Sequence, residues 1–184
     1  LKDATKEPVK YLWYVGDFAS FNQNCQDTTR KVAEVLTAAG VDFGIMGKKE
    51  KSAGNDVRRA GEEGLFEVLA EQNIEMLEKC DFEEIFTTDP HTFNTLKNEY
   101  PVKGGNYSVK HYSTLLLELI KSGDIELKKK LDIKATYHDP CYLGRYNGIY
   151  DDPRDVMELC GIDLVEMPRN KENSFCLVLA VDEF

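Results

Sequence analysis

The residues best suited to chemistry are concentrated in one stretch of the chain, which reads Tyr137-His138-Asp139-Pro140-Cys141-Tyr142-Leu143-Gly144-Arg145-Tyr146-Asn147. It supplies an imidazole, a carboxylate, a thiol and a guanidinium in close succession. Such a set serves a metal site with a thiolate ligand, a nucleophilic thiol with a neighbouring base, or a turn that holds a buried cysteine. The stretch alone does not decide among these three, so the elements around it must.

Composition limits the class of protein. The chain has 184 residues, of which 42% are hydrophobic and 30% charged, and this balance fits one compact α/β domain or two small fused lobes. The formal net charge of -10 argues against a nucleic-acid partner, because phosphate backbones are bound by clustered Lys and Arg. We therefore expect partners other than nucleic acid.

The cysteines and the chain start indicate the cellular setting. The five cysteines are an odd number without a Cys-x-x-Cys pair, which does not resemble a secreted disulfide framework. No apolar run approaches the ~20 residues that span a bilayer, and the start has no signal-peptide core and no Met. We expect a cytoplasmic piece of a longer protein, associated with a membrane through other segments or a partner. Cys25, Cys80 and Cys160 lie on predicted helix faces and are interpreted as small buried apolar residues.

Apolar patterning predicts an alternation of strands and helices. Strands are predicted at 9–15, 41–46, 84–88, 107–112, 133–137 and 164–167, and helices at 27–39, 62–79, 90–100, 113–121 and 152–160. Asp89 is the expected N-cap of the helix that begins at Pro90. The long polar loop at 47–61 is of a length that is usually functional. Strict alternation predicts an α/β, Rossmann-like, mostly parallel sheet with flanking helices and right-handed crossovers.

Reactive side chains follow several of these strands. In open parallel sheets, ligands bind outside the carboxyl ends of the strands. The residues predicted at that edge include all three histidines and are Asp17, Asp89, His91, His111, His138, Asp139 and Cys141. An alternative explanation holds for the aspartates, because short polar residues also suit strand-to-helix turns.

An internal repeat relates the two halves of the chain. The segment 14–22 is echoed by 137–147, each with a reactive position followed by an aromatic residue and Asn. Asp17 precedes Ser52 by 35 positions, and Cys141 precedes Cys176 by the same 35. A further 36 positions lead from Ala53 to Asp89. The repeat predicts two related lobes, at 1–105 and 106–184.

On these residues the chain resembles the cysteine-rich CCG-domain proteins of heterodisulfide reductase type and the iron–sulfur oxidoreductases linked to electron-transfer flavoprotein. Their motif is a Cys, a Cys-Cys-Gly and a Cys-x-x-Cys, separated by intervals like those above and usually present twice. Residues 138–148, 166–170 and 172–176 look like the second motif, and residues 87–100 look like the end of the first. The resemblance covers essentially the whole chain.

The first motif lacks thiols. The cysteine positions that the resemblance implies are occupied by Asp17, Ser52, Ala53, Asp89 and Thr92. Cluster iron requires thiolate or imidazole ligands, so we predict no iron–sulfur cluster there. A hard or borderline ion held by Asp17, Asp89 and His91 is the weaker alternative, because the capping role already explains Asp89.

The second motif keeps two thiols. The resemblance implies that Cys141 and Cys176 are metal ligands, with His138 and Arg145 as donors around the cofactor. Leu177-Val178 stands where the family has Cys-Gly, and no Cys-x-x-Cys follows. A [4Fe–4S] cluster takes four cysteines. We therefore expect such a cluster in the full-length parent and none in this chain.

The last nine residues have a suggestive origin. Codons for Cys-Cys-Gly-Ala-Gly-Gly-Gly-Arg-Ile, after loss of one base from the second codon, encode Cys-Leu-Val-Leu-Ala-Val-Asp-Glu-Phe, which is the sequence of residues 176–184. We hypothesise that this end is a frameshifted form of the Cys-Cys-Gly segment. Sequencing the coding DNA tests the idea, since codons incompatible with a one-base slip would exclude it.

Several functions remain open. The resemblance implies electron transfer from a flavoprotein or ferredoxin-type donor to a quinone or disulfide acceptor, with electron-transfer flavoprotein, a ferredoxin-type domain or a membrane-bound quinone-reducing protein as partner. A non-catalytic docking module for such a partner is the main alternative. A hydrolase would use Cys141 with His138 or His111 as base, but no oxyanion hole is evident. No Gly-x-Gly-x-x-Gly or Walker loop marks a nucleotide site.

Overall fold

The structure is a computed structural model that describes residues 1–176. The hypothesis about the reading frame concerns residues 177–184 and lies outside the described residues. The chain forms two compact units, Leu1–Leu115 and Leu116–Phe184, and the division falls within helix α6 (Tyr112–Ser122).

The first unit alternates strands and helices as the sequence predicts. Its strands are β1 (Lys2–Asp3), β2 (Val9–Trp13), β3 (Phe43–Ile45), β4 (Phe82–Thr87) and β5 (Val109–His111). Its helices are α1 (Asp17–Phe21), α2 (Gln23–Ala38), α3 (Asn55–Arg59), α4 (Glu63–Leu77) and α5 (Pro90–Asn94). A π-helical turn at Thr95–Glu99 and 3-10 turns at Gly47–Lys49 and Tyr100–Lys103 complete it.

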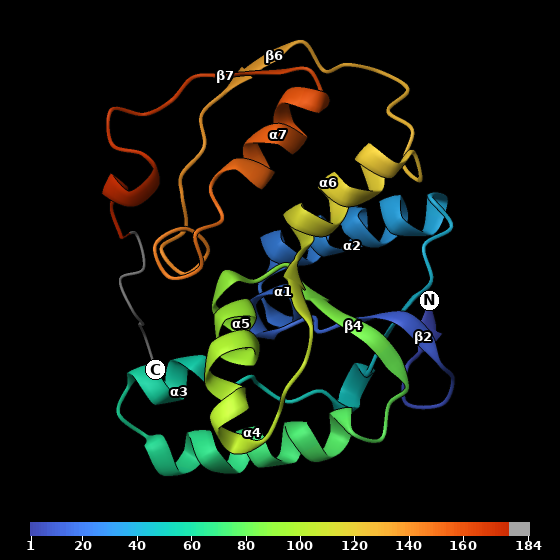
Figure 1. Cartoon of the computed structure of the whole chain (residues 1–184), viewed down its shortest axis with the longest axis vertical. Helices are drawn as coiled ribbons and strands as arrows, with labels where there is room; N and C mark the ends of the chain where they lie inside the picture. Colours follow the sequence, from blue (N-terminus) through green and yellow to red (C-terminus); the bar gives the residue numbers. More distant parts are fainter. Residues whose placement is uncertain (177–184) are drawn as a thin grey trace. The chain divides into compact units, whose positions relative to one another are not determined.

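All pairs in the five-stranded sheet of the first unit are parallel, in the order β1-β3-β2-β4-β5 (Figure 1). This confirms the predicted α/β class. Strand β2 lies at the centre: Leu12 pairs with Gly44 of β3 on one side and with Ile85 of β4 on the other. After β2 the chain adds β3 on one side of this strand and then β4 on its other side. The direction in which strands are added to the sheet therefore reverses at β2.

Helices cover both faces of this sheet (Figure 1). Successive side chains of a strand point to opposite faces. Leu12, Tyr14 and Ile85 join one core cluster with the apolar residues of α4, which are Phe66, Ala70, Ile74 and Leu77. The rings of Trp13, Phe43 and Phe86 contact one another instead, with Trp13 and Phe86 stacked at 5.2 Å between centroids. These ring contacts therefore link β2, β3 and β4 to one another.

Some element bounds differ from those that patterning predicts. The helix expected at 27–39 begins at Gln23, because the Asn22 side chain accepts hydrogen bonds from the backbone N–H groups of Asn24 and Cys25 at 3.0 and 3.2 Å. The predicted helix at 90–100 is α5 followed by the π-helical and 3-10 turns. The expected N-cap at Asp89 is confirmed. Strand β1 was not predicted, because two residues are too few to show an alternation of apolar and polar side chains.

The second unit has its own small sheet. Strands β6 (Ile133–Ala135) and β7 (Ile162–Leu164) pair in parallel, with helix α7 (Asp151–Leu159) between them in the chain. The last strand therefore lies slightly before the predicted 164–167. A 3-10 turn at Lys171–Asn173 follows.

The expectation that one sheet edge carries all three histidines is wrong. His91 and His111 follow or end strands of the five-stranded sheet, whereas His138 follows β6, which pairs with β7. The physical reason is the surface of β6: Ile133 is 49% exposed and none of the three residues is buried. A strand inside a parallel sheet requires apolar contacts on both faces.

The helices found in residues 1–176 are all too short or too polar to cross a membrane.

Candidate functional site

The first candidate site lies at the carboxyl ends of β2, β3 and β4. Three segments meet there: Asp17 follows β2, Ser52 and Ala53 follow β3, and Asp89 and Thr92 follow β4. They line one small pocket of about 10 Å³, together with Phe18, Asn55, Asp56 and His91. All five positions that the resemblance equates with cysteines are thus brought together. The place is where the sheet reverses its order, which is the usual ligand position in open α/β sheets.

Asp17 and Ser52 contact each other directly. The Ser52 hydroxyl donates to Asp17 Oδ2 at 2.6 Å and accepts from the Gly54 backbone N–H at 3.2 Å. Burial raises the pKa of Asp17; the Ser52 hydrogen bond opposes this, and the carboxylates of Asp56 and Asp89 raise it further. The spacing of 35 residues therefore corresponds to a real contact across the site.

Asp89 is fully engaged as a helix cap. Its carboxylate accepts from the backbone N–H groups of His91 and Thr92 at 3.1 and 3.0 Å and from the Thr92 hydroxyl at 2.6 Å. Burial raises the pKa of Asp89, but the hydrogen bonds from His91 and Thr92 outweigh it and hold this pKa below its ordinary value. In residues 1–176, no three or more His, Cys, Asp or Glu side chains meet as a metal site.

The first pocket does not fit an iron–sulfur cluster. Its lining has no thiol, and its volume of about 10 Å³ is near the space of one water molecule. Gly16 makes the close approach possible: its φ is 82°, and a Cβ there would lie 3.3 Å from Thr92 Oγ1. The segments after β2 and β3 are joined by the Ser52–Asp17 hydrogen bond, and the segment after β4 packs closely against Gly16.

Buried side chains hold the loop after β3 at this site. Three successive backbone carbonyls of the loop each accept a hydrogen bond. Tyr14 Oη donates to the Lys51 carbonyl at 2.6 Å, Asn73 Nδ2 to the Ser52 carbonyl at 2.8 Å, and Tyr100 Oη to the Ala53 carbonyl at 3.1 Å. Burial raises the pKa of Tyr14 and Tyr100 well above the ordinary value, so both phenols stay protonated donors. The loop is thus positioned by the core of the unit.

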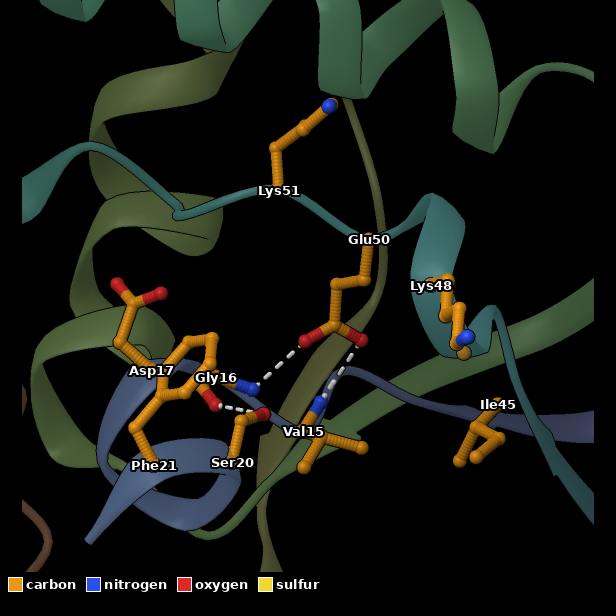
Figure 2. Close-up of a pocket in the computed structure, with 10 residues that line it drawn as sticks. Val15, Gly16, Asp17, Ser20, Phe21, Ile45, Lys48, Glu50 and Lys51 are labelled. Atoms are coloured by element: carbon orange, nitrogen blue, oxygen red, sulfur yellow. Dashed lines mark hydrogen bonds between the residues drawn. The ribbon is translucent and has the colours of Figure 1, made fainter.

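A larger pocket of about 510 Å³ adjoins this loop. Figure 2 shows Glu50 reaching from the loop toward the end of β2, where its carboxylate accepts from the backbone N–H groups of Val15 and Gly16 at 3.0 and 2.7 Å. Burial raises the pKa of Glu50 to about 7, against the opposing effect of these two N–H groups. Asp17, near the same pocket, raises it as well.

Sequence reasoning missed Glu50. The predicted functional loop includes it, but it stands in the run Lys48-Lys49-Glu50-Lys51, which is typical of a solvated surface. Only the fold shows that this carboxylate satisfies two backbone donors. His111, predicted at the edge, is buried at the end of β5 with Nδ1 2.7 Å from Ser113 Oγ, and burial lowers its pKa to about 4.

The second candidate site holds the two predicted thiols. Cys141 Sγ and Cys176 Sγ lie 3.9 Å apart, which matches the Asp17–Ser52 contact at the same spacing of 35 residues. Cys141 is half-buried and Cys176 exposed. Two thiols are half of the set that a [4Fe–4S] cluster takes, so residues 1–176 do not complete such a site.

Hydrogen bonds join the two cysteine-bearing segments independently of sulfur. Arg145 Nη1 donates to the Ser174 carbonyl at 2.6 Å, and Ser174 Oγ donates to the Asp139 carbonyl at 3.1 Å. The Lys171 backbone N–H donates to Asp139 Oδ2 at 2.6 Å. The segment before Cys176 is therefore held against the loop around Cys141 by three polar contacts.

A buried guanidinium supports this loop and was not predicted. Arg154, on α7, donates to the two Asp139 oxygens at 2.7 and 2.8 Å and to Glu166 at 2.5 and 3.0 Å. Burial raises the pKa of Asp139, but the Arg154 guanidinium and the Lys171 N–H reverse this and keep it below its ordinary value. Nothing in the local sequence marks Arg154, because its partners are distant in the chain.

Arg145 and His138 are the two residues expected beside the thiols. Burial and then the Cys176 thiol raise the pKa of Cys141, and the Arg145 guanidinium acts in the opposite direction. Arg145 thus lies within reach of the Cys141 sulfur, where the sequence expects it. His138 is half-buried and adjoins Asp139 in the chain. Their roles around a cofactor remain predictions.

The other three cysteines occupy helical positions. Cys25 lies in α2, Cys80 follows α4, and Cys160 follows α7 as its C-cap. All three are half-buried and not fully buried as expected. They are free thiols.

Comparisons with known proteins agree with these sites. The CCG family model, described as "Cysteine-rich domain", matches residues 14–97 and 135–176. These ranges contain both candidate sites. No solved structure matches the chain.

Relatives with assigned names are iron–sulfur proteins or redox enzymes. The chain is 43% identical to the "Probable iron-sulfur-binding oxidoreductase FadF" of Bacillus subtilis, over 96% of this chain and 25% of that protein. It is 40% identical to the "EtfAB:quinone oxidoreductase" of Syntrophomonas wolfei, over 91% and 23%. It is 33% identical to one polypeptide of the dihydromethanophenazine:CoB–CoM heterodisulfide reductase of Methanosarcina mazei, over 93% and 43%. The chain thus spans about a quarter of the first two.

Proposed function

Because the chain belongs to the family of cysteine-rich CCG domains, we propose that it is an electron-transfer module of an iron–sulfur oxidoreductase. The observation that carries this proposal is the contact of Cys141 with Cys176 at 3.9 Å, at the spacing of the family motif. The names of the relatives support electron transfer in general. The role of each residue follows from the geometry around the thiols.

Cys141 and Cys176 supply two thiolate ligands in the full-length protein, and the missing ligands come from outside residues 1–176. A [4Fe–4S] cluster bound there supplies one-electron chemistry. Arg145 offers a cationic donor beside the Cys141 sulfur, and His138 lies two positions before Pro140 on the same loop. Hydrogen bonds and charges near cluster sulfurs tune the reduction potential. The Arg154–Asp139 pair orients the loop.

The proposed partners follow from the relatives. The name of the Syntrophomonas protein includes EtfAB and quinone, and that of the Methanosarcina protein a heterodisulfide. We infer that the donor is an electron-transfer flavoprotein or a ferredoxin-type domain. The acceptor is a quinone or a disulfide. We propose a cytoplasmic location, with association to a membrane-bound partner where the acceptor is a quinone.

For this chain by itself, the proposal is that the second site stays empty or poorly metallated. Anaerobic reconstitution with iron and sulfide, followed by ultraviolet–visible and electron paramagnetic resonance spectra, measures this. We expect iron well below four per chain. A stoichiometric four-iron signal would refute the empty-site proposal.

The ligand roles are tested in the full-length protein. We expect Cys141→Ser and Cys176→Ser each to remove a cluster signal, because each deletes a thiolate. Cys160→Ser is the matched control: it is half-buried in the same unit and follows α7. Unchanged spectra in both ligand variants would exclude these cysteines from the site.

A docking module remains the alternative, and one observation favours it. Phe18 and Phe21, on α1 next to the thiol-free first pocket, are 54% and 83% exposed. Exposed aromatic rings are typical of protein interfaces. Co-purification with electron-transfer flavoprotein discriminates: docking through α1 predicts that Phe18→Ser with Phe21→Ser weakens it, while Cys141→Ser does not.

A further inference from the structure

We propose that Cys141 and Cys176 form a reversible intrachain disulfide in this chain, so that the second site works as a dithiol redox switch where no cluster is bound. The proposal rests on the 3.9 Å separation of the two sulfurs and on the polar contacts that keep their segments together. It does not depend on the electron-transfer function proposed above. It concerns thiol chemistry of residues that the chain itself contains.

The two thiols remain neighbours without a metal ion. Ser174, two residues before Cys176, forms hydrogen bonds with Arg145 and with Asp139. These two partners lie on either side of Cys141 in the chain, so the bonds join the two cysteine-bearing segments. Asp139 is in turn held by the buried Arg154. Because none of these bonds involves sulfur, the separation of the thiols is set by the fold.

Closure of the disulfide needs only a small movement. An S–S bond is about 2.05 Å long, so the sulfurs must approach by about 2 Å. Cys176 is exposed, whereas Cys141 is half-buried. Gly144, in the loop after Cys141, packs against the Tyr150 ring where a Cβ would collide, which keeps that loop in one shape. The movement therefore falls on Cys176.

The oxidant is a low-molecular-weight disulfide such as glutathione disulfide. The exposed Cys176 thiolate attacks one of its sulfurs, forming a mixed disulfide and releasing one thiol. The Cys141 thiolate then attacks Cys176 Sγ, which forms the internal S–S bond and releases the second thiol. The chain loses two electrons and two protons, and the oxidant gains both as two thiols.

Thiol counting tests the switch on the iron-free chain. After incubation with glutathione disulfide and unfolding, we expect the five thiols to fall to three, with a mass decrease of about 2 Da and a linked peptide containing Cys141 and Cys176. Dithiothreitol should restore all five. Cys160→Ser, in the same unit, should still lose two thiols.

The single variants separate the switch from general thiol oxidation. Cys141→Ser should stop at the mixed disulfide on Cys176, seen as one added glutathione and one lost thiol. Cys176→Ser should react slowly, because Cys141 is half-buried. Five remaining thiols in the oxidised wild type, or a linked peptide with Cys25, Cys80 or Cys160, would overturn the proposal.

Discussion

Replacement of Glu50 by Gln is expected to change how the stability of the first unit depends on pH. Folding raises the pKa of this carboxyl to about 7, from an ordinary value of 4.5. The folded state therefore binds the Glu50 proton more tightly than the unfolded chain does. This stabilisation is complete below about pH 4.5 and is lost as the pH rises through about 7.

The size of the effect follows from the shift. Each pKa unit corresponds to 1.36 kcal/mol, and the change from 4.5 to about 7, discounted for partial exposure of Glu50, gives about 2 to 3 kcal/mol. The glutamine side chain of the variant does not titrate, but its amide oxygen can still accept from Val15 or Gly16. The free energy of unfolding of the wild type, relative to that of Glu50→Gln, should therefore fall by about 2 to 3 kcal/mol between pH 4.5 and pH 8.

Urea unfolding at a series of pH values measures this difference. Trp13, the only tryptophan, lies in the core of the first unit, so its fluorescence reports on the unit that contains Glu50. His111, whose pKa is lowered to about 4, titrates in both proteins and cancels. Glu71→Gln, at an exposed position of α4, is the control and should show a flat difference. A flat difference for Glu50→Gln would refute the reasoning.

Three further substitutions test the contacts within the sites. Arg154→Met should destabilise the second unit by about 3 to 5 kcal/mol, because it leaves the Asp139 carboxylate buried without its cation. Hydrogen exchange of backbone amides in this unit measures the loss, and unchanged protection would contradict it. Ser52→Ala should cost about 1 to 2 kcal/mol in urea unfolding, since the partly buried Asp17 loses its donor. Asp89→Ala should cost about 1 to 2 kcal/mol through loss of the N-cap, whereas Asp89→Ser should keep most of it; equal losses would exclude the capping explanation.

Much of the first unit was predictable because its signals are local. Apolar runs mark strands that are buried on both faces, and a capping residue such as Asp89 marks a helix start within a few positions. The start of α2 was predicted four residues too late, because the Asn22 cap begins the helix at Gln23, before the apolar pattern begins. Sheet membership was less predictable: β6 and β7 form a separate pair, since strand pairing depends on contacts distant in the chain.

The amino-acid sequence by itself indicated the pairs Asp17 with Ser52 and Cys141 with Cys176, because both pairs have the same spacing of 35 residues, and the structure brings each pair into contact. It also determined that the first site has no thiol. Only the tertiary structure decided that this pocket has the volume of about one water, and that Glu50 caps the two N–H groups after β2. Burial and pKa depend on how segments pack, and no local pattern records that packing.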